Sequence, residues 1–154
     1  MIDQSTLVRI REVNLEDTEQ LIGLYHELLP WDILDFKTSQ EILEQIIHND
    51  QYHIFLLEVN KQIIATCTLV IIHNLTHQGK PYGIIENVVT DRQYRGEKYG
   101  EILLKEVITF AKKEGCHKLM VQTRRKELYV KKFYKKCGFS DEQCTGFILN
   151  FEET

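Results

Sequence analysis

The segment at residues 91–104, DRQYRGEKYGEILL, combines residue types that bind phosphate groups. Arg95 and Lys98 carry positive charge, and Gly96 and Gly100 let phosphate oxygens approach the backbone where a Cβ atom would block them. The apolar run IIENVV precedes the segment and a helical pattern follows it, so the glycines lie where a strand leads into a helix. Unpaired N–H groups and the helix dipole attract anions at such a point. The segment therefore predicts a pyrophosphate site. Taken by itself, the turn is equally consistent with an ordinary strand-to-helix connection.

Glu86 places a carboxylate inside the apolar run that precedes this turn. In a regularly alternating strand, Ile84, Glu86 and Val88 would share one face, where a carboxylate costs free energy unless it has a partner or a chemical role. One such role is to accept, directly or through a water, the proton that an ammonium group must lose before its nitrogen attacks a carbonyl. A structural ion pair is the alternative.

Length and composition favour one soluble domain. With 154 residues, of which 43% are hydrophobic, the chain can bury a core, and we expect a single domain over residues 1–154. No run approaches the roughly 20 apolar residues of a membrane-spanning helix, and the first residues lack the pattern of a signal peptide. We therefore expect a cytoplasmic protein without a membrane partner. The cysteines show no metal-ligand spacing, so we expect reduced thiols and no metal site: Cys67, Cys116, Cys137 and Cys144.

The charge is unevenly distributed along the chain. The net charge is −4, but the stretch RRKELYVKKFYKK, residues 124–136, carries +6 and the remainder carries −10. Because duplex-binding domains are usually basic as a whole, this pattern favours a local anion site over a nucleic-acid surface. A nucleic-acid-binding protein that uses this stretch is a rival hypothesis, and a solvated helix face is an equal alternative for Lys132, Lys135 and Lys136 taken singly.

The first half of the chain predicts two helices and four strands. LVRIREV alternates like a half-buried strand, and Asn14 with Asp17 supplies helix-start chemistry. The stripe of the helix that follows comprises Leu21, Leu24, Tyr25 and Leu28. Thr38 and Glu41 form a candidate capping box for a second helix. YHIFLLEV and QIIATCTLVII, joined by Asn60 and Lys61, predict a hairpin, and IIENVVT completes a three-stranded antiparallel meander.

The second half predicts alternating helices and strands. The helix after the glycine turn has a stripe of Ile102, Leu103, Val107, Phe110 and Ala111, and it ends at Gly115. KLMVQT then predicts a buried strand. A basic helix follows, with a stripe of Val130, Phe133, Tyr134 and Cys137 and with Gly138 at its end. TGFILNFEE, residues 145–153, predicts a final alternating strand, and the whole order describes an α/β layered domain.

Residues 84–139, from IIENVV to FYKKCGF, resemble the GCN5-related N-acetyltransferase (GNAT) family, in which the motif R/Q-x-x-G-x-G/A binds the pyrophosphate of acetyl-coenzyme A. The resemblance implies the GNAT fold, an α/β fold with a mixed, mostly antiparallel central sheet and helices on both faces. It also implies acetyl-coenzyme A as cosubstrate, no metal, a small-molecule amine as acceptor and a homodimer.

The resemblance also implies which residues hold the coenzyme. Arg95 and Gly100 occupy the first and last motif positions, whereas Lys98 stands where the family has a middle glycine. A side chain there either crowds the phosphate or contacts it as a charged donor, and we favour the second. By the same resemblance, the backbone of the strand binds the pantetheine arm and N–H groups of the turn bind the phosphates. The full set is Val88, Val89, Arg95, Gly96, Lys98, Tyr99 and Gly100.

Two catalytic residues are implied as well. Glu86 stands on the strand where the family often has an acidic base or water-holding residue, and Tyr134 stands where a tyrosine commonly assists the departing thiolate of coenzyme A. Tyr134 as one more member of the core stripe is the alternative. The N–H of Val88 is the family's usual donor to the oxyanion. In the family, the connection between the first two helices commonly covers the acceptor. In this chain, Tyr25, Trp31 and Phe36 lie in or beside that connection, and core packing is the equal alternative for each. We expect His73 and His77, in the loop before the catalytic strand, to border the acceptor pocket.

The sequence thus predicts an N-acetyltransferase that transfers acetyl to a primary amine by direct attack. One specific acceptor is an amino-sugar phosphate, because IENVV, Lys98, GCHK and FYKKCGF are similar to stretches of glucosamine-6-phosphate N-acetyltransferases. Those enzymes usually have an acidic residue where Asn87 stands, and Arg124, Arg125 and Lys126 offer charge for a phosphate. A non-catalytic acyl-coenzyme-A-binding module is a second alternative.

Overall fold

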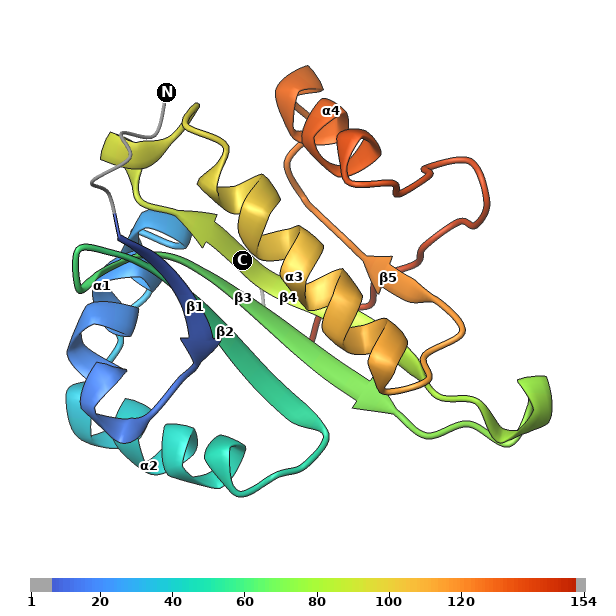
Figure 1. Cartoon of the computed structure of the whole chain (residues 1–154), viewed down its shortest axis with the longest axis horizontal. Helices are drawn as coiled ribbons and strands as arrows, with labels where there is room; N and C mark the ends of the chain where they lie inside the picture. Colours follow the sequence, from blue (N-terminus) through green and yellow to red (C-terminus); the bar gives the residue numbers. More distant parts are fainter. Residues whose placement is uncertain (1–6, 152–154) are drawn as a thin grey trace. The chain divides into compact units, whose positions relative to one another are not determined.

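The computed structural model describes residues 7–151, which form two compact units that meet between Val121 and Gln122. The first unit contains, in chain order, β1 (Val8–Glu12), α1 (Thr18–Leu28), α2 (Phe36–Ile47), β2 (Tyr52–Val59), β3 (Gln62–Ile72), β4 (Tyr82–Thr90), α3 (Tyr99–Lys113) and β5 (Leu119–Val121) (Figure 1). Short 3-10 turns lie at Leu15–Asp17, His77–Gly79 and Arg92–Tyr94. The second unit contains α4 (Leu128–Lys136). Within residues 7–151, no helix combines the length and the apolar character needed to cross a bilayer.

The sheet of the first unit has the order β1-β2-β3-β4-β5. The first four strands are antiparallel to their neighbours, and β5 is parallel to β4. The predicted meander is therefore confirmed. The hairpin between β2 and β3 turns at Asn60 and Lys61, which have φ values of +50° and +71°. Positive φ at both positions is what a two-residue hairpin loop requires, because it matches the twist of the strands.

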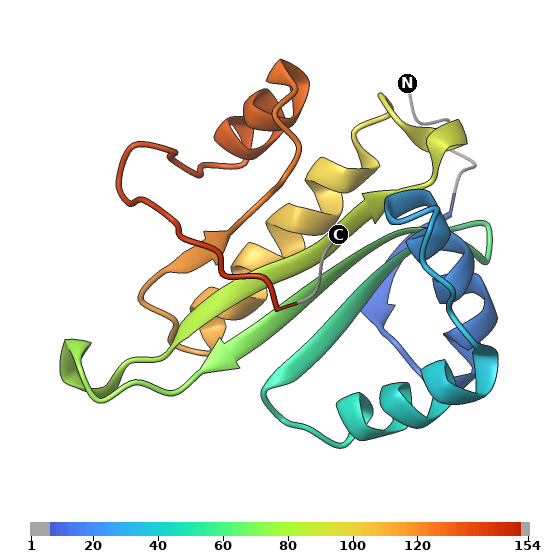
Figure 2. The ribbon, with the colours of Figure 1, turned by 180° about the vertical axis from the view of Figure 1, so that it is seen from behind.

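Helices cover both faces of this sheet, as the family resemblance implies. Phe55 and Leu56 are consecutive in β2, so their side chains point to opposite faces. Leu56 packs in a buried cluster with Leu21 of α1 and Leu43 of α2. Phe55 instead contacts Phe110 of α3 at a ring separation of 5.1 Å. Accordingly, α3 lies over one face in Figure 1, and α1 and α2 lie over the other in Figure 2.

The start of α1 follows the sequence prediction, whereas the start of α2 does not. The side chain of Asn14 accepts a hydrogen bond from Glu16 N, and Asp17 accepts one from Asn14 N, so both helix-start residues act as expected. For α2, the candidate capping box of Thr38 and Glu41 is wrong. Asp35 caps the helix, and its carboxylate accepts a hydrogen bond from Thr38 N at 2.8 Å. The N-cap is thus Asp35 and the helix begins at Phe36, three residues earlier than the capping box of Thr38 and Glu41 predicts.

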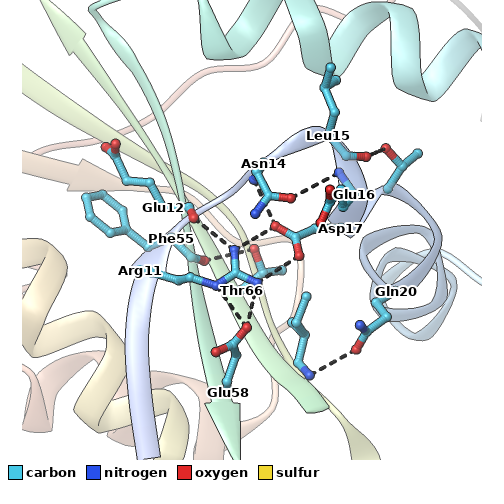
Figure 3. Close-up of polar contacts among 12 residues, drawn as sticks. Arg11, Glu12, Asn14, Leu15, Glu16, Asp17, Gln20, Phe55, Glu58 and Thr66 are labelled. Atoms are coloured by element: carbon cyan, nitrogen blue, oxygen red, sulfur yellow. Dashed lines mark hydrogen bonds and ion pairs between the residues drawn. The ribbon is translucent and has the colours of Figure 1, made fainter. Parts of the chain in front are cut away.

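A cluster of three charged side chains joins β1, β2 and the segment before α1 (Figure 3). Arg11 forms two hydrogen bonds to the carboxylate of Asp17, at 2.7 and 2.8 Å, and one from Nε to Glu58 at 2.8 Å. The side chains are 19%, 7% and 13% exposed, respectively. Burial raises the pKa of Asp17, but the hydrogen bonds from Arg11 and from Asn14 N outweigh it, and the net shift is downward. Arg11 and Asp17 are therefore both charged at neutral pH, in a largely buried place.

Two strand predictions in the last third of the chain need correction. The predicted buried strand KLMVQT is only three residues long, and its residues are half-buried. In the second unit, residues 145–151 are not a strand, and Phe147, Ile148 and Leu149 are exposed; residues 152 and 153 of the prediction lie outside the described residues. An alternating sequence becomes a strand only where a neighbouring strand offers hydrogen bonds, and the described part of this unit contains none.

Candidate active site

A β-bulge interrupts β4 at the position of the predicted catalytic carboxylate. Thr68 of β3 pairs with Glu86, but Thr66 pairs with Val89, so Asn87 and Val88 together face one residue of β3. Asn87 has a φ of +50°. The extra residue moves every later side chain of the strand to the other face. The expectation that Glu86 and Val88 share a face is therefore wrong: Glu86 shares its face with Val89 instead.

The bulge leaves Glu86 exposed at the surface of the face that α1 and α2 cover. Tyr52 of β2 lies near it: burial raises the pKa of Tyr52, and the charge of Glu86 raises it further. No ion pair of Glu86 is present in the described part of the chain, so the alternative of a structural ion pair gains no support there. A carboxylate in this setting is accessible to a substrate or a water.

The edge of β4 that faces β5 is open beyond Glu86. The ladder between the two strands joins Gly83–Ile85 to Leu119–Val121 and ends there. Within the described residues, the rest of β4 pairs only with β3. Val88 and Val89 lie in this open part. Unpaired backbone groups along a strand edge can bind an extended ligand as an added strand, so this edge fits the pantetheine arm of coenzyme A.

Arg95 is held in place by a contact that the sequence pattern does not reveal. Its Nη2 atom lies 2.8 Å from Oε2 of Glu27 in α1, and its Nε atom donates to the carbonyl of Thr90 at 2.9 Å. The same Glu27 oxygen accepts a hydrogen bond from Arg92 N at 3.0 Å. The Arg95 side chain is 46% exposed. Glu27 therefore fixes the turn, and Arg95 offers part of its guanidinium to solvent.

The turn that follows has the backbone geometry of an anion site. Gly96 has a φ of +88°, and a Cβ atom there would meet nothing within 4 Å, so its surface is open. Lys98 precedes α3 with a φ of +68°, and its side chain makes no capping hydrogen bond. The first N–H groups of α3, beginning at Tyr99 and Gly100, have no partner within the helix. Uncapped donors and the helix dipole fit a pyrophosphate.

Lys98 adopts the left-handed conformation that glycine tolerates best, so the backbone at this position has a conformation that suits the glycine of the family motif. We expect Lys98→Gly to stabilise the protein by about 0.5–1 kcal/mol, the strain relieved less the entropy that glycine loses. We also expect it to weaken coenzyme A binding a few-fold, since the exposed amine is placed to contact phosphate. Thermal unfolding and calorimetric titration measure the two effects.

Lys61 offers the matched control, because it also has a positive φ but lies in the β2–β3 hairpin. Lys61→Gly should give a similar gain in stability and leave coenzyme A binding unchanged. Tighter binding by Lys98→Gly would instead show that the lysine side chain crowds the phosphate.

Tyr134 lies in the second unit, on α4. Its ring contacts those of Phe133 and Phe139 edge-on, with centroids 5.0 and 5.9 Å apart. Val130 of the same stripe is buried, and Tyr134 is half-buried. The helix ends at Lys136, and Gly138, which follows two residues later, has a φ of +97°. Tyr134 thus packs with the stripe and keeps part of its surface open, and its role toward the thiolate stays a prediction.

The other residues singled out by sequence differ in exposure. In the connection between α1 and α2, Trp31 is 78% exposed, and Phe36 at the start of α2 is 49% exposed, whereas Tyr25 is largely buried. His77 stacks on His117 with ring centroids 3.9 Å apart. Within residues 7–151, no group of three or more His, Cys, Asp or Glu side chains is arranged to hold a metal ion.

Comparison with known proteins identifies the family. The acetyltransferase (GNAT) family model matches residues 12–139. The chain is 31% identical to the glucosamine 6-phosphate N-acetyltransferase of Trypanosoma brucei brucei over 86 residues. These residues are 56% of this chain and 56% of that protein. The match thus spans little more than half the length of that relative.

Two solved structures extend the likeness to the fold. A protein of Agrobacterium tumefaciens str. C58 that is assigned as an acetyltransferase superposes with a TM-score of 0.88 and 34% identity, over 92% of this chain and 99% of that one. The glucosamine-6-phosphate N-acetyltransferase of Arabidopsis thaliana superposes with a TM-score of 0.83 and 24% identity, over 95% of this chain and 99% of that one. The chain has the GNAT fold and belongs to the acetyltransferase (GNAT) family, whose members are acyltransferases that use acetyl-coenzyme A.

Proposed function

We propose that this protein transfers the acetyl group of acetyl-coenzyme A to the primary amine of a phosphorylated amino sugar, by direct attack of the amine. The observation that carries the proposal is the junction of β4 and α3. There, an open strand edge leads directly into a turn with positive φ angles and an uncapped helix start. The strand edge suits an extended arm and the helix start suits a pyrophosphate, in the order in which the coenzyme presents them.

The donor side of the site is formed by consecutive residues. The backbone of Val88 and Val89 holds the pantetheine arm, and the N–H groups of Gly96, Tyr99 and Gly100 hold the phosphates. Arg95 and Lys98 add positive charge. The coenzyme supplies the activated acyl group, and the chain's own part is to orient it beside the bulge. The N–H of Val88 is the group that we propose as donor to the developing oxyanion.

Direct attack is favoured over a cysteine acyl-enzyme. Cys67 of β3 lies opposite the bulge of β4. Burial raises the pKa of its thiol to about 12, so the reactive thiolate is not populated near neutral pH. Glu86 is the exposed carboxylate at the same place and can accept the proton of the attacking ammonium. Tyr134 is the proposed donor to the departing thiolate.

The acceptor assignment rests on the relatives and on local charge. Both the trypanosome and the Arabidopsis relatives carry the name glucosamine 6-phosphate N-acetyltransferase. In this chain, Arg125 and Lys126 are exposed basic residues beside Arg124, which donates a hydrogen bond to Asn150 at 3.2 Å. Such residues suit a sugar phosphate. We propose that the enzyme acts in the cytoplasm.

The test is an acetyl-transfer assay that follows release of free coenzyme A, with product identified by mass spectrometry. Glucosamine 6-phosphate should be acetylated, and glucosamine without the phosphate should react at least tenfold more slowly, because a charge-assisted contact contributes about 1.5–3 kcal/mol. Equal rates with both sugars would overturn the phosphate assignment. Transfer only to unrelated amines would overturn the amino-sugar assignment and leave the acetyltransferase activity intact.

A further inference from the structure

A buried hydroxyl group lies under the proposed catalytic carboxylate without a hydrogen-bond partner. Thr68 of β3 is fully buried, and its Oγ1 atom has no hydrogen bond of good geometry within the described residues, although the Tyr25 hydroxyl is close enough to interact with it. Buried polar side chains are nearly always hydrogen-bonded in folded proteins. Thr66, two residues earlier on the same face and also fully buried, is satisfied: its hydroxyl donates to the Phe55 carbonyl at 3.1 Å (Figure 3). The missing partner is thus particular to Thr68.

Two groups near Thr68 can complete its hydrogen bonds. Burial raises the pKa of Tyr25 to about 12, against a smaller lowering by the neighbouring hydroxyls of Thr68 and Thr66, so Tyr25 is protonated and can donate. Glu86 is the cross-strand partner of Thr68 in the β3–β4 ladder. Directly opposite residues of an antiparallel pair share a face with Cβ atoms about 5 Å apart, within reach of a glutamate side chain.

We propose that the Thr68 hydroxyl donates a hydrogen bond to the Glu86 carboxylate when that side chain turns toward the sheet, and that the Tyr25 hydroxyl donates to Thr68 in turn. This inference rests on the proposed function, in which Glu86 accepts the proton of the acceptor amine. Thr68 and Tyr25 are then positioning residues. They hold the acceptor oxygen at the bulge, where the amine must lose its proton, once the coenzyme covers the open edge of β4.

The relay moves no proton of its own. The N–H bond of the ammonium breaks, its proton forms an O–H bond on Glu86, and the nitrogen keeps the electron pair that attacks the acetyl carbon. Glu86 then returns the proton to water. Thr68 and Tyr25 keep their protons throughout and supply only hydrogen bonds.

The relay predicts the direction of a pH effect. A hydrogen bond donated to a carboxylate favours its charged form, so its loss raises the pH at which the carboxylate titrates. The titratable groups around this spot are Tyr25 of α1, Tyr52 of β2 and Cys67 of β3. All three have raised pKa values and stay neutral while a carboxylate titrates, so they do not obscure the effect.

The experiment compares Thr68→Val with the matched control Thr66→Val. Carbon-13 NMR of glutamate-labelled protein, with coenzyme A bound, follows the titration of the Glu86 carboxylate, which Glu86→Gln assigns by loss of its signal. We expect the titration midpoint to rise in Thr68→Val and to stay unchanged in Thr66→Val. Thr68→Ser, which keeps the hydroxyl, should restore the wild-type midpoint.

Thr68→Val should change activity more than stability. With glucosamine 6-phosphate, Thr68→Val should lower kcat about tenfold, move the acid limb of kcat/KM upward and leave the KM for acetyl-coenzyme A unchanged. Its melting temperature should fall only slightly, because valine keeps the shape of the side chain but leaves the Tyr25 hydroxyl without this acceptor. Thr66→Val, which loses a formed hydrogen bond, should melt lower.

The outcomes separate the two levels of the proposal. If Thr68→Val and Thr66→Val titrate alike while Glu86→Gln is inactive, the relay is wrong and the function of Glu86 stands. If Glu86→Gln is fully active, Glu86 is not the base and the relay is wrong, whereas the acetyl transfer itself stands. If coenzyme A does not bind, the relay and the proposed function are both overturned.

Discussion

Replacing Glu86 by glutamine will lower kcat/KM for acetyl transfer by about 10²–10⁴, the usual contribution of a positioned general base. The amide keeps the shape of the side chain but cannot accept the proton of the ammonium. Because Glu86 is exposed and forms no ion pair within the described residues, the variant should fold with unchanged stability. The measurement is release of coenzyme A at saturating acetyl-coenzyme A, beside a thermal unfolding curve.

Glu106→Gln is a matched control, because Glu106 is an exposed glutamate on α3. It should retain full activity. Tyr134→Phe tests the second catalytic assignment and should lower kcat, since the departing thiolate loses its proton donor. If neither Glu86→Gln nor Tyr134→Phe changes the rate, the catalytic assignments are wrong. If the wild-type protein binds acetyl-coenzyme A and acetylates no amine, the chain is the non-catalytic binding module.

Replacing Arg11 by leucine will destabilise the protein by about 3–5 kcal/mol, because it leaves two carboxylates in a largely buried place without their cation. Asp17 and Glu58 are 7% and 13% exposed, and Arg11 bonds both. For a chain of this size, the loss corresponds to a decrease in melting temperature of about 6–20 °C. Urea unfolding monitored by circular dichroism measures the change.

Arg9→Leu controls for the general effect of removing an arginine from β1. Arg9 is exposed, so this variant should unfold within about 0.5 kcal/mol of the wild type. If the two arginine variants are equally stable, the Arg11 cluster contributes no stability. We expect the double variant Arg11→Leu, Asp17→Leu to be more stable than Arg11→Leu alone. This result would show that the loss of stability comes from the unpaired carboxylate.

Much of the fold follows from short-range patterns. Asn60 and Lys61 predict the β2–β3 hairpin because two consecutive positive φ angles are confined to a few loop types. Asn14 and Asp17 predict the start of α1 because their side chains satisfy nearby N–H groups. Gly115, with a φ of +79°, ends α3 where the sequence places the end. In each case, the residues that decide the geometry are adjacent in sequence.

The features that the sequence does not reveal depend on distant parts of the chain. The bulge at Asn87 arises from the register with β3, and the run IIENVV alternates as a regular strand would. The contact between Arg95 and Glu27 joins residues 68 positions apart. Residues 145–151 alternate like a strand, but the described part of their own unit contains no neighbouring strand. The sequence pattern thus predicts candidate site residues, while the sheet face and the partners of each residue depend on the tertiary structure.

The most direct test of the central claim, that the β4–α3 junction binds acetyl-coenzyme A, is a thermal unfolding curve with and without this ligand and with adenosine as the control. At a ligand concentration 100 times Kd, binding should stabilise the folded state by about 2.7 kcal/mol. For a chain of this size, that is a rise in Tm of roughly 5–11 °C. The account predicts this rise with acetyl-coenzyme A and none with adenosine. An unchanged Tm at saturating acetyl-coenzyme A would contradict it.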